Sequence, residues 1–273
     1  IYGLIGKNGA GKTTLIRIIC GLQEPTNGEF TINGKSNNSS DIINARKRMG
    51  AIIEAPSIYG EMTARDNLIE QYKLVGMPSF DGIDELLKLV GLENTGKKKA
   101  KNFSLGMKQR LGIAISLANN PDFLILDEPI NGLDPQGIIE IRELILKLNK
   151  ERRITILISS HYLDELSKIA THYGFLDSGS IIEEITSEEL MKKMEHKLIL
   201  KVSNQKDFVK YFEEHKISYE VIDNKTIHVY GKYNLSKFVN ELSKNNLIAD
   251  EIHEQEESLE NYYINLIGGS NND

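Results

Sequence analysis

The sequence has few of the features that mark secreted or membrane-spanning chains. Its one cysteine, Cys20, cannot form an internal disulfide, so we expect a reducing compartment, and its place on an apolar helix face predicts packing rather than reactivity. No stretch approaches the roughly 18 consecutive apolar residues of a transmembrane helix, and no signal-peptide pattern is present. The sequence therefore predicts a cytosolic chain, and any membrane spans that it works with would lie in another chain.

The chain has no excess of positive charge, and its histidines lack metal-binding spacings. A net charge of -6 and a pI near 5.7 argue against bulk attraction to nucleic acid or anionic lipid, although a local basic patch is compatible with them. The run Lys97–Lys101 is such a candidate, but a short run in an acidic chain is typical of a solvated loop. We therefore expect no nucleic-acid partner. Five histidines lack a convergent Cys/His spacing and are interpreted as surface or packing residues rather than metal ligands: His172, His196, His215, His228 and His253.

The beginning of the chain lacks an initiating methionine. Residues 1–5 are apolar enough to form a buried strand that runs directly into a glycine-rich loop. We therefore expect a sequence that is truncated at its N-terminus.

The 273 residues, 40% of them apolar, are enough for one large α/β domain and a small second one. Residues 1 to about 190 alternate short β-branched runs with helical stretches, which predicts a mostly parallel sheet covered by helices. A mainly helical subdomain is expected at about 64–119, between the second and third strands. The continuous apolar runs that predict strands buried on both faces are Tyr2–Ile5, Ala51–Ile53, Phe123–Leu126, Ile154–Ile158 and Tyr173–Leu176.

The pattern changes to shorter units after a boundary placed at about 190–196. Apolar runs and helical stretches then follow in the order β-α-β-β-α-β, with the last strand expected over Ile248–His253. This order predicts a small ferredoxin-like α+β domain over 196–269. Tyr211 and Phe212 lie on the apolar face of a short helix and are predicted to belong to its core.

A phosphate-binding loop follows the first strand. The segment Gly6–Thr13, GKNGAGKT, fits the pattern G-x-x-x-x-G-K-[ST] between a strand and a helix. Glycines let successive amide groups converge on a phosphate at the helix N-terminus, Lys12 reaches the β- and γ-phosphate oxygens of ATP, and the Thr13 hydroxyl can bind Mg²⁺. The residues expected to contact the nucleotide here are Gly6, Asn8, Gly9, Ala10, Gly11, Lys12, Thr13 and Thr14.

Two adjacent carboxylates end the strand Phe123–Leu126. Ligands of open α/β sheets bind at the C-terminal ends of strands, where two neighbouring acids are costly without a cation. Asp127 is predicted to hold Mg²⁺ through its water shell, and Glu128 is predicted to accept a proton from the attacking water.

The order of these motifs resembles that of the ABC ATPase family over about residues 1–190. The segment Phe103–Arg110 resembles the signature of that family, with Ser104 and Gly106 retained and Leu105 and Met107 departing from it. Ser104 would cap a helix whose amide groups face a phosphate. In the family that phosphate is the γ-phosphate bound to a second copy, so the resemblance implies a head-to-tail dimer with two shared ATP sites.

Two further segments follow the pattern of the family. Asn131–Asp134, before Pro135 at a helix start, resembles the loop that communicates between the two sites, with Asp134 as its principal residue. His161 follows the strand Ile154–Ile158 and resembles the switch histidine that contacts the γ-phosphate. A lone histidine is more often structural, but its place beyond a strand end and after the two acids favours the functional interpretation.

The sequence departs from the family at Glu54, where a glutamine usually touches the water bound to the metal. A carboxylate should bind Mg²⁺ more strongly and alter hydrolysis. Glu54, Tyr59-Gly60, Leu68 and the signature together resemble the bacitracin-resistance and lantibiotic-immunity transporters. A second departure is the absence of the aromatic residue that stacks on adenine upstream of the first strand, for which Tyr2 lies too close to the phosphate loop.

The resemblance implies an ATP-hydrolysing subunit at the cytoplasmic face of the membrane, attached to integral-membrane permease subunits that export or remove a peptide antibiotic. One alternative is a soluble ABC ATPase acting on ribosomes or DNA, which predicts tandem cassettes or a long coiled-coil insertion, and the sequence contains neither. Another is a regulatory module whose C-terminal domain senses a ligand.

Overall fold

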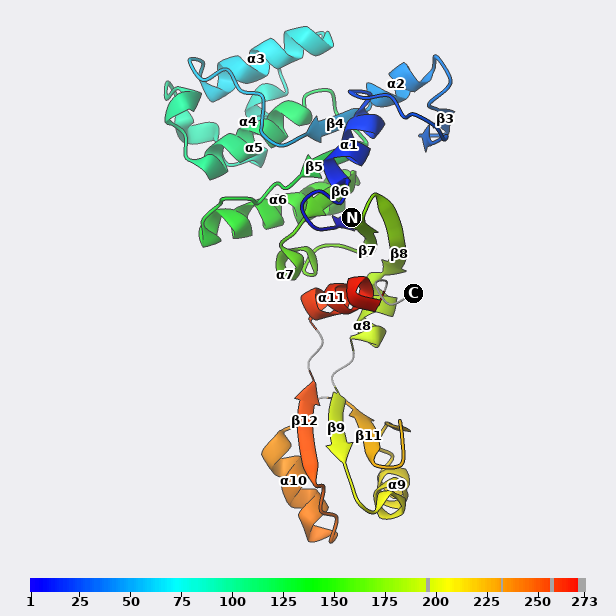
Figure 1. Ribbon diagram of the computed structural model, residues 1–273. Helices are drawn as coiled ribbons and strands as arrows, with labels where there is room; N and C mark the ends of the chain where they lie inside the picture. The colour runs from blue at the N-terminus through cyan, green and yellow to red at the C-terminus, as the bar shows by residue number, and fades with distance from the viewer. Residues whose placement is uncertain (195–196, 232, 256–257, 270–273) are drawn as a thin grey trace. The chain divides into compact units, whose positions relative to one another are not determined.

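The computed structural model describes residues 1–194, 197–231, 233–255 and 258–269 (Figure 1). The chain divides into two compact units, Ile1–Ser187 and a second that begins at Glu188. His196 and part of the boundary predicted at 190–196 lie outside the described residues. Among the described residues, no helix combines the length and the apolar character needed to cross a membrane.

The first unit is built on a six-stranded sheet in the order β4-β5-β6-β1-β7-β8. Strands β4, β5, β6, β1 and β7 are parallel, which confirms the five predicted strands. The prediction for β4 was wrong in part, because this edge strand spans Met49–Ile52 and its Ala51 is exposed rather than buried. The antiparallel edge strand β8 was not predicted, because its sequence, SIIEEIT, has no such run. The strands are β1 (Tyr2–Ile5), β4 (Met49–Ile52), β5 (Phe123–Asp127), β6 (Thr155–Ser160), β7 (His172–Asp177) and β8 (Ser180–Thr186), with a separate hairpin of β2 (Thr31–Ile32) and β3 (Lys35–Ser36).

Between β4 and β5 the chain forms a group of helices beside the β4 edge, as expected (Figure 1). Thr63 and Asp66 form a capping box at the start of α3, and Gly91, with a φ of 66°, follows the end of α4. In the basic run, Lys99 and Lys101 pair with Glu61, at 3.0 and 2.9 Å. The helices of this unit are α1 (Lys12–Cys20), α2 (Ile42–Arg46), α3 (Ala64–Val75), α4 (Ile83–Leu89), α5 (Leu105–Ser116), α6 (Pro135–Arg152) and α7 (Leu163–Leu166), with short 3₁₀ turns at Glu93–Thr95 and Ala100–Asn102.

The register of the sheet brings three loops together at the C-terminal ends of its central strands. In the parallel pairs, Ile5 lies opposite Ser160, and Asp127 lies opposite Ser159. The strands β1, β5 and β6 therefore end at the same level, and the loops that follow them are neighbours. Candidate site residues from three distant stretches of sequence meet there.

The second unit contains a four-stranded antiparallel sheet in the order β10-β11-β9-β12. Helices α9 and α10 share one core with it, in which Leu200, Phe212, Ile227 and Phe238 are buried. The last strand begins at Glu251 rather than at Ile248, which is 79% exposed. The elements are α8 (Ser187–Lys193), β9 (Lys197–Lys201), α9 (Gln205–Glu214), β10 (Tyr219–Val221), β11 (Thr226–Tyr230), α10 (Leu235–Lys244), β12 (Glu251–Gln255) and α11 (Leu259–Gly269).

Candidate nucleotide-binding site

The loop between β1 and α1 is shaped by three glycines. Gly9 and Gly11 have φ values of 83° and 108°, in the left-handed region that side chains disfavour, and Gly11 is the N-cap of α1. A Cβ at Gly6 would lie 2.7 Å from the carbonyl oxygen of Leu176 in β7. The loop therefore requires glycine at these positions, and it ends at a helix N-terminus whose free amide groups suit an anion.

Lys12 is folded back into the loop. Its side chain is buried, and its Nζ donates to the carbonyl oxygen of Gly6 at 2.6 Å and to that of Lys7 at 3.3 Å. The same Nζ lies 3.6 Å from Oε1 of Glu128. The positive charge is therefore held near the C-terminal ends of β1 and β5.

Asp127 is the buried carboxylate of the site. Thr13 Oγ1 donates to its Oδ2 at 3.0 Å, and Ser159 Oγ donates to its Oδ1 at 2.5 Å. Asp127 is 2% exposed, so these two hydroxyl groups satisfy a charge that burial would otherwise make costly. The hydroxyl and carboxylate oxygens of Thr13 and Asp127 are hard ligands, which fit Mg²⁺ held through one or two protein groups together with phosphates and water.

Glu128 follows directly, and its carboxylate lies near the lysine. Its backbone has a φ of 50°, a left-handed conformation that is uncommon for a residue with a side chain. Its amide donates to Ser159, to the carbonyl oxygen at 3.1 Å and to Oγ at 3.0 Å. Its Oε2 lies 2.7 Å from Nδ1 of His161. Lys12, Glu128 and His161, predicted from three separate motifs, thus meet around one carboxylate.

The signature segment lies next to the loop that contains Asp134, in the same chain. Ser104 caps α5 by accepting from the amide of Met107 at 3.2 Å, and Asp134 caps α6 by accepting from the amide of Gly137 at 3.1 Å. An added Cβ at Gly106 would lie 3.9 Å from Cδ2 of Leu133. The two helix starts are therefore neighbours.

Glu54 forms an ion pair that the sequence analysis did not predict. Its Oε1 accepts from Nη2 of Arg17, on α1, at 2.6 Å. The backbone of Glu54 is left-handed, with a φ of 63°, and its side chain is 62% exposed. This pairing places the carboxylate beside the helix that begins with Lys12 and Thr13.

The arrangement has counterparts in known proteins. Residues 1–131 match the profile described as ABC transporter. The chain is 44% identical to the bacitracin transport ATP-binding protein BcrA of Bacillus licheniformis, over 98% of this chain and 89% of that protein. The chain belongs to the ABC transporter ATP-binding family.

Two other comparisons extend this assignment within the ABC family. The chain is 47% identical to the lantibiotic transport ATP-binding protein SrtF of Streptococcus pyogenes, over 67% of this chain and 78% of that protein. It resembles a dimeric, post-hydrolysis structure of the ATP-binding cassette MJ0796 bound to ADP and Pi, with a TM-score of 0.60 and 28% identity over 68% of this chain and 85% of that one. As an ABC transporter subunit, this chain binds and hydrolyses ATP.

Ser159 is the residue of this ABC site that the sequence analysis missed. It donates to Asp127 and accepts from the amide of Glu128, so it holds both carboxylates in place. A signal was present, because Ser159 and Ser160 end an otherwise apolar strand run, where burial makes hydroxyl groups expensive unless they bond. Its contact with Asp127 depends on the pairing register of β5 and β6.

Proposed function

We propose that this ABC subunit powers the export or removal of a peptide antibiotic such as bacitracin through separate membrane subunits. The observation that carries this proposal is the 44% identity, over nearly the whole chain, to a protein named for bacitracin transport. The similarity to a protein named for lantibiotic transport supports the same class of substrate. The second candidate, an ABC ATPase acting on ribosomes or DNA, is not favoured, because these relatives are named for transport.

The contacts of the site support distinct roles for its charged residues. Glu128 accepts a proton from the water that attacks the γ-phosphorus, while the bond from that phosphorus to the bridging oxygen of ADP breaks. Lys12, now bonded to loop carbonyls, turns its Nζ to the β- and γ-phosphate oxygens, where charge develops. His161 orients Glu128 through the 2.7 Å contact of its Nδ1 and touches the γ-phosphate.

Thr13 and Asp127 are the residues that would hold Mg²⁺, with Glu54 as the additional carboxylate predicted from the sequence. When bound, the ion neutralises charge on the β- and γ-phosphates. The carboxylate of Asp127 is held between the hydroxyl groups of Thr13 and Ser159. Ser159 fixes that carboxylate, so its orientation does not depend on the nucleotide.

Two copies of the chain are proposed to close head to tail over two ATP molecules. Ser104, Gly106 and Asp134 would then face the γ-phosphate bound to the other copy. The exposure of Leu105, 49% for a large apolar side chain at the start of α5, supports a partner surface there. Integral-membrane permease subunits would hold the dimer at the cytoplasmic face of the membrane.

The second unit is proposed to be an accessory ferredoxin-like domain over about 196–269. Its strand order β10-β11-β9-β12, with α9 and α10 in one core, supports this assignment. The core is apolar and aromatic, which favours a structural or dimer-supporting role over catalysis.

The decisive test of the shared site is the mass of the Glu128→Gln variant in solution. With hydrolysis blocked, light scattering should give a monomer without nucleotide and twice that mass with Mg-ATP. The matched control is Glu151→Gln, at the exposed end of α6, which should hydrolyse ATP and show no lasting dimer. A persistent monomer that binds ATP would contradict the head-to-tail proposal.

The substrate is tested in cells that contain the subunit and its membrane partners. The intact subunit should raise the bacitracin concentration that stops growth, and the Glu128→Gln variant should not. Equal resistance with both proteins would contradict peptide removal powered by this site, whereas the ATPase assignment would stand.

A further inference from the structure

An ion pair outside the roles described above joins two helices behind the site. Arg142 on α6 donates to Glu165 on α7, with Nη1 and Oε2 2.5 Å apart. Helix α6 has Asp134 as its N-cap, and α7 begins two residues after His161. The pair therefore connects the helix that follows the communication loop with the helix that follows the switch histidine.

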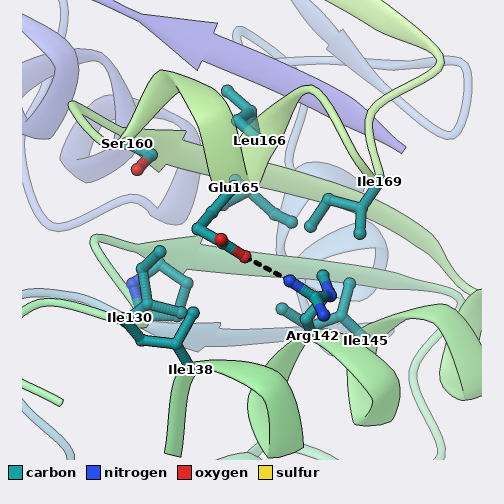
Figure 2. Close-up of a pocket in the computed structure, with 10 residues that line it drawn as sticks. Ile130, Ile138, Arg142, Ile145, Ser160, Glu165, Leu166 and Ile169 are labelled. Carbon is teal, nitrogen blue, oxygen red and sulfur yellow. Dashed lines mark hydrogen bonds and ion pairs between the residues drawn. The ribbon is translucent and has the colours of Figure 1, made fainter. Parts of the chain in front are cut away.

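The pair lies at a cavity with apolar walls, where the two side chains point toward one another from facing helices (Figure 2). The side chains are only 23% and 22% exposed, so salt screens their attraction less than it would at the surface. The cavity volume is about 20 Å³, which is room for about one water and too little for a ligand. Its apolar lining is formed by Pro129, Ile130, Ile138, Ile145, Ile158, Leu166 and Ile169.

Glu165 remains a carboxylate because two cations share it. Lys168 Nζ donates to Oε1 at 2.5 Å, and this bond, together with the bond from Arg142, holds the pKa of Glu165 below its ordinary value although burial opposes the shift. The Lys168 contact stays within a single turn of chain. The Arg142 contact crosses from α7 to α6, so it can fix the position of one helix on the other.

Helix α7 depends on such contacts because it has four residues. A helix of this length is not stable alone in water, so its place is set by tertiary packing. Its own Leu163 and Leu166 are buried, and its Glu165 forms the ion pair with Arg142. His161 lies only two residues before α7, so a shift of the helix would move the imidazole away from Glu128.

We propose that Arg142 and Glu165 are positioning residues for ATP hydrolysis, which hold α7 against α6 so that His161 stays on Glu128. The inference rests on the roles proposed for Glu128 and His161. It assigns the pair no contact with the nucleotide. It also gives the loop of Asp134 a mechanical connection to the catalytic carboxylate of its own chain, through α6, Arg142, Glu165 and α7.

The experiment compares Arg142→Gln, Glu165→Gln and the double variant in the full-length subunit. Each single change should lower kcat for ATP about tenfold, since a displacement of a positioned group by a fraction of an ångström has effects of this order. The dissociation constant for ATP should stay within about twofold, because the phosphate loop is untouched. The double variant should be no slower than either single variant, because both break the same link.

Two controls separate positioning from loss of structure. Lys168→Gln removes an ion pair of Glu165 but leaves the connection to α6, so its kcat should stay within about twofold of the unchanged protein. In a His161→Ala background, Arg142→Gln should produce no further fall, because the residue acts through His161.

Several outcomes would overturn the inference: an unchanged kcat for Arg142→Gln, an equal loss with Lys168→Gln, additive losses in the double variant, or a further tenfold loss without His161. The failure of the underlying proposal is distinguishable, because His161→Ala alone would then hydrolyse ATP at the ordinary rate. If His161→Ala is slow and Arg142→Gln is not, only the positioning inference fails.

Discussion

The two units of the chain differ in what they bury. In the first unit, the buried charged residues among those described are Lys12 and Asp127, which lie with the buried Ser159 and Ser160 where β1, β5 and β6 end. The other buried polar residues of this unit, Asn67, Gln109 and Ser116, are uncharged and lie on α3 and α5. In the described part of the second unit, the buried side chains are apolar or aromatic. Burying a charged group costs free energy unless the group is paired. The buried charges of Lys12 and Asp127 therefore mark these strand ends as the functional site of the fold.

The two units also use their helices differently. Helix α1 presents its N-terminus and Lys12 to the phosphate loop, whereas α9 presents Tyr211 and Phe212 to an apolar core. The first arrangement serves an anion, and the second serves stability. Changes at the two helices should therefore have separable consequences.

The largest expected effect is at Lys12. Lys12→Met should lower the ATP hydrolysis rate by at least about 100-fold, because the charge that meets the phosphate oxygens is lost. The melting temperature should fall only slightly, since the loop carbonyls and Glu128 lose a partner while methionine still fills the buried site. Phosphate release and thermal unfolding measure both quantities. The exposed Lys35→Met is the control, and a rate within threefold of it would contradict the role of Lys12.

A change in the second unit should have the opposite signature. Phe212 is fully buried, so Phe212→Ala should destabilise that unit by about 3–5 kcal/mol. Lys210→Ala, on the same helix and 77% exposed, is the matched control. Proteolysis followed by mass spectrometry would show cleavage within the second unit at low denaturant, while the first unit still binds a fluorescent ATP analogue. Loss of nucleotide binding in step with cleavage would show that the two units unfold together.

Local patterns were enough to predict much of this architecture. The run FLIL predicted β5, and the loop GKNGAGKT predicted the link between β1 and α1, because each depends on residues adjacent in sequence. Tyr211 and Phe212 were predicted to be core residues and are buried, which confirms the helical face. Asp127 and Glu128 could be placed at a strand end for the same reason.

Contacts between distant segments could not be predicted in this way. The bond from Ser159 to Asp127 follows from the register of two strands, and the Arg17–Glu54 and Arg142–Glu165 pairs depend on how elements pack. Sequence spacing does not encode either property. Ile248 was misassigned to a strand because an apolar residue near an alternating pattern fits locally, whereas pairing with β9 begins at Glu251.

A change at Glu54 tests whether an exposed residue near the buried site also takes part in ATP hydrolysis. Glu54→Gln should raise the Mg²⁺ concentration needed for half-maximal ATP hydrolysis about threefold to tenfold in the assembled transporter, because a charged oxygen ligand is lost. Stability should change by at most about 1 kcal/mol, since the pair with Arg17 is largely exposed.

Arg17→Gln distinguishes the loss of a metal ligand from the loss of the ion pair, because it breaks the pair with Glu54 and keeps the Glu54 carboxylate. If both variants shift the Mg²⁺ requirement equally, the ion pair is responsible. If Glu54→Gln has no effect on the requirement or on the rate, Glu54 has no special role in the site.

The prediction that bears least on ATP hydrolysis concerns Cys20, at the end of α1 opposite the phosphate loop. Burial raises the pKa of its thiol to about 11 from an ordinary value of 9.0, and the nearby Arg46 only partly opposes this shift. Because the thiolate is the reactive form, alkylation by iodoacetamide at pH 7.5 should be about 100-fold slower in the folded chain than in denaturant. Prior alkylation in denaturant followed by refolding provides the reference for complete labelling. Rapid labelling of the folded chain, with loss of ATP hydrolysis, would mean that a residue at the far end of α1 also affects catalysis at the site of Lys12 and Asp127.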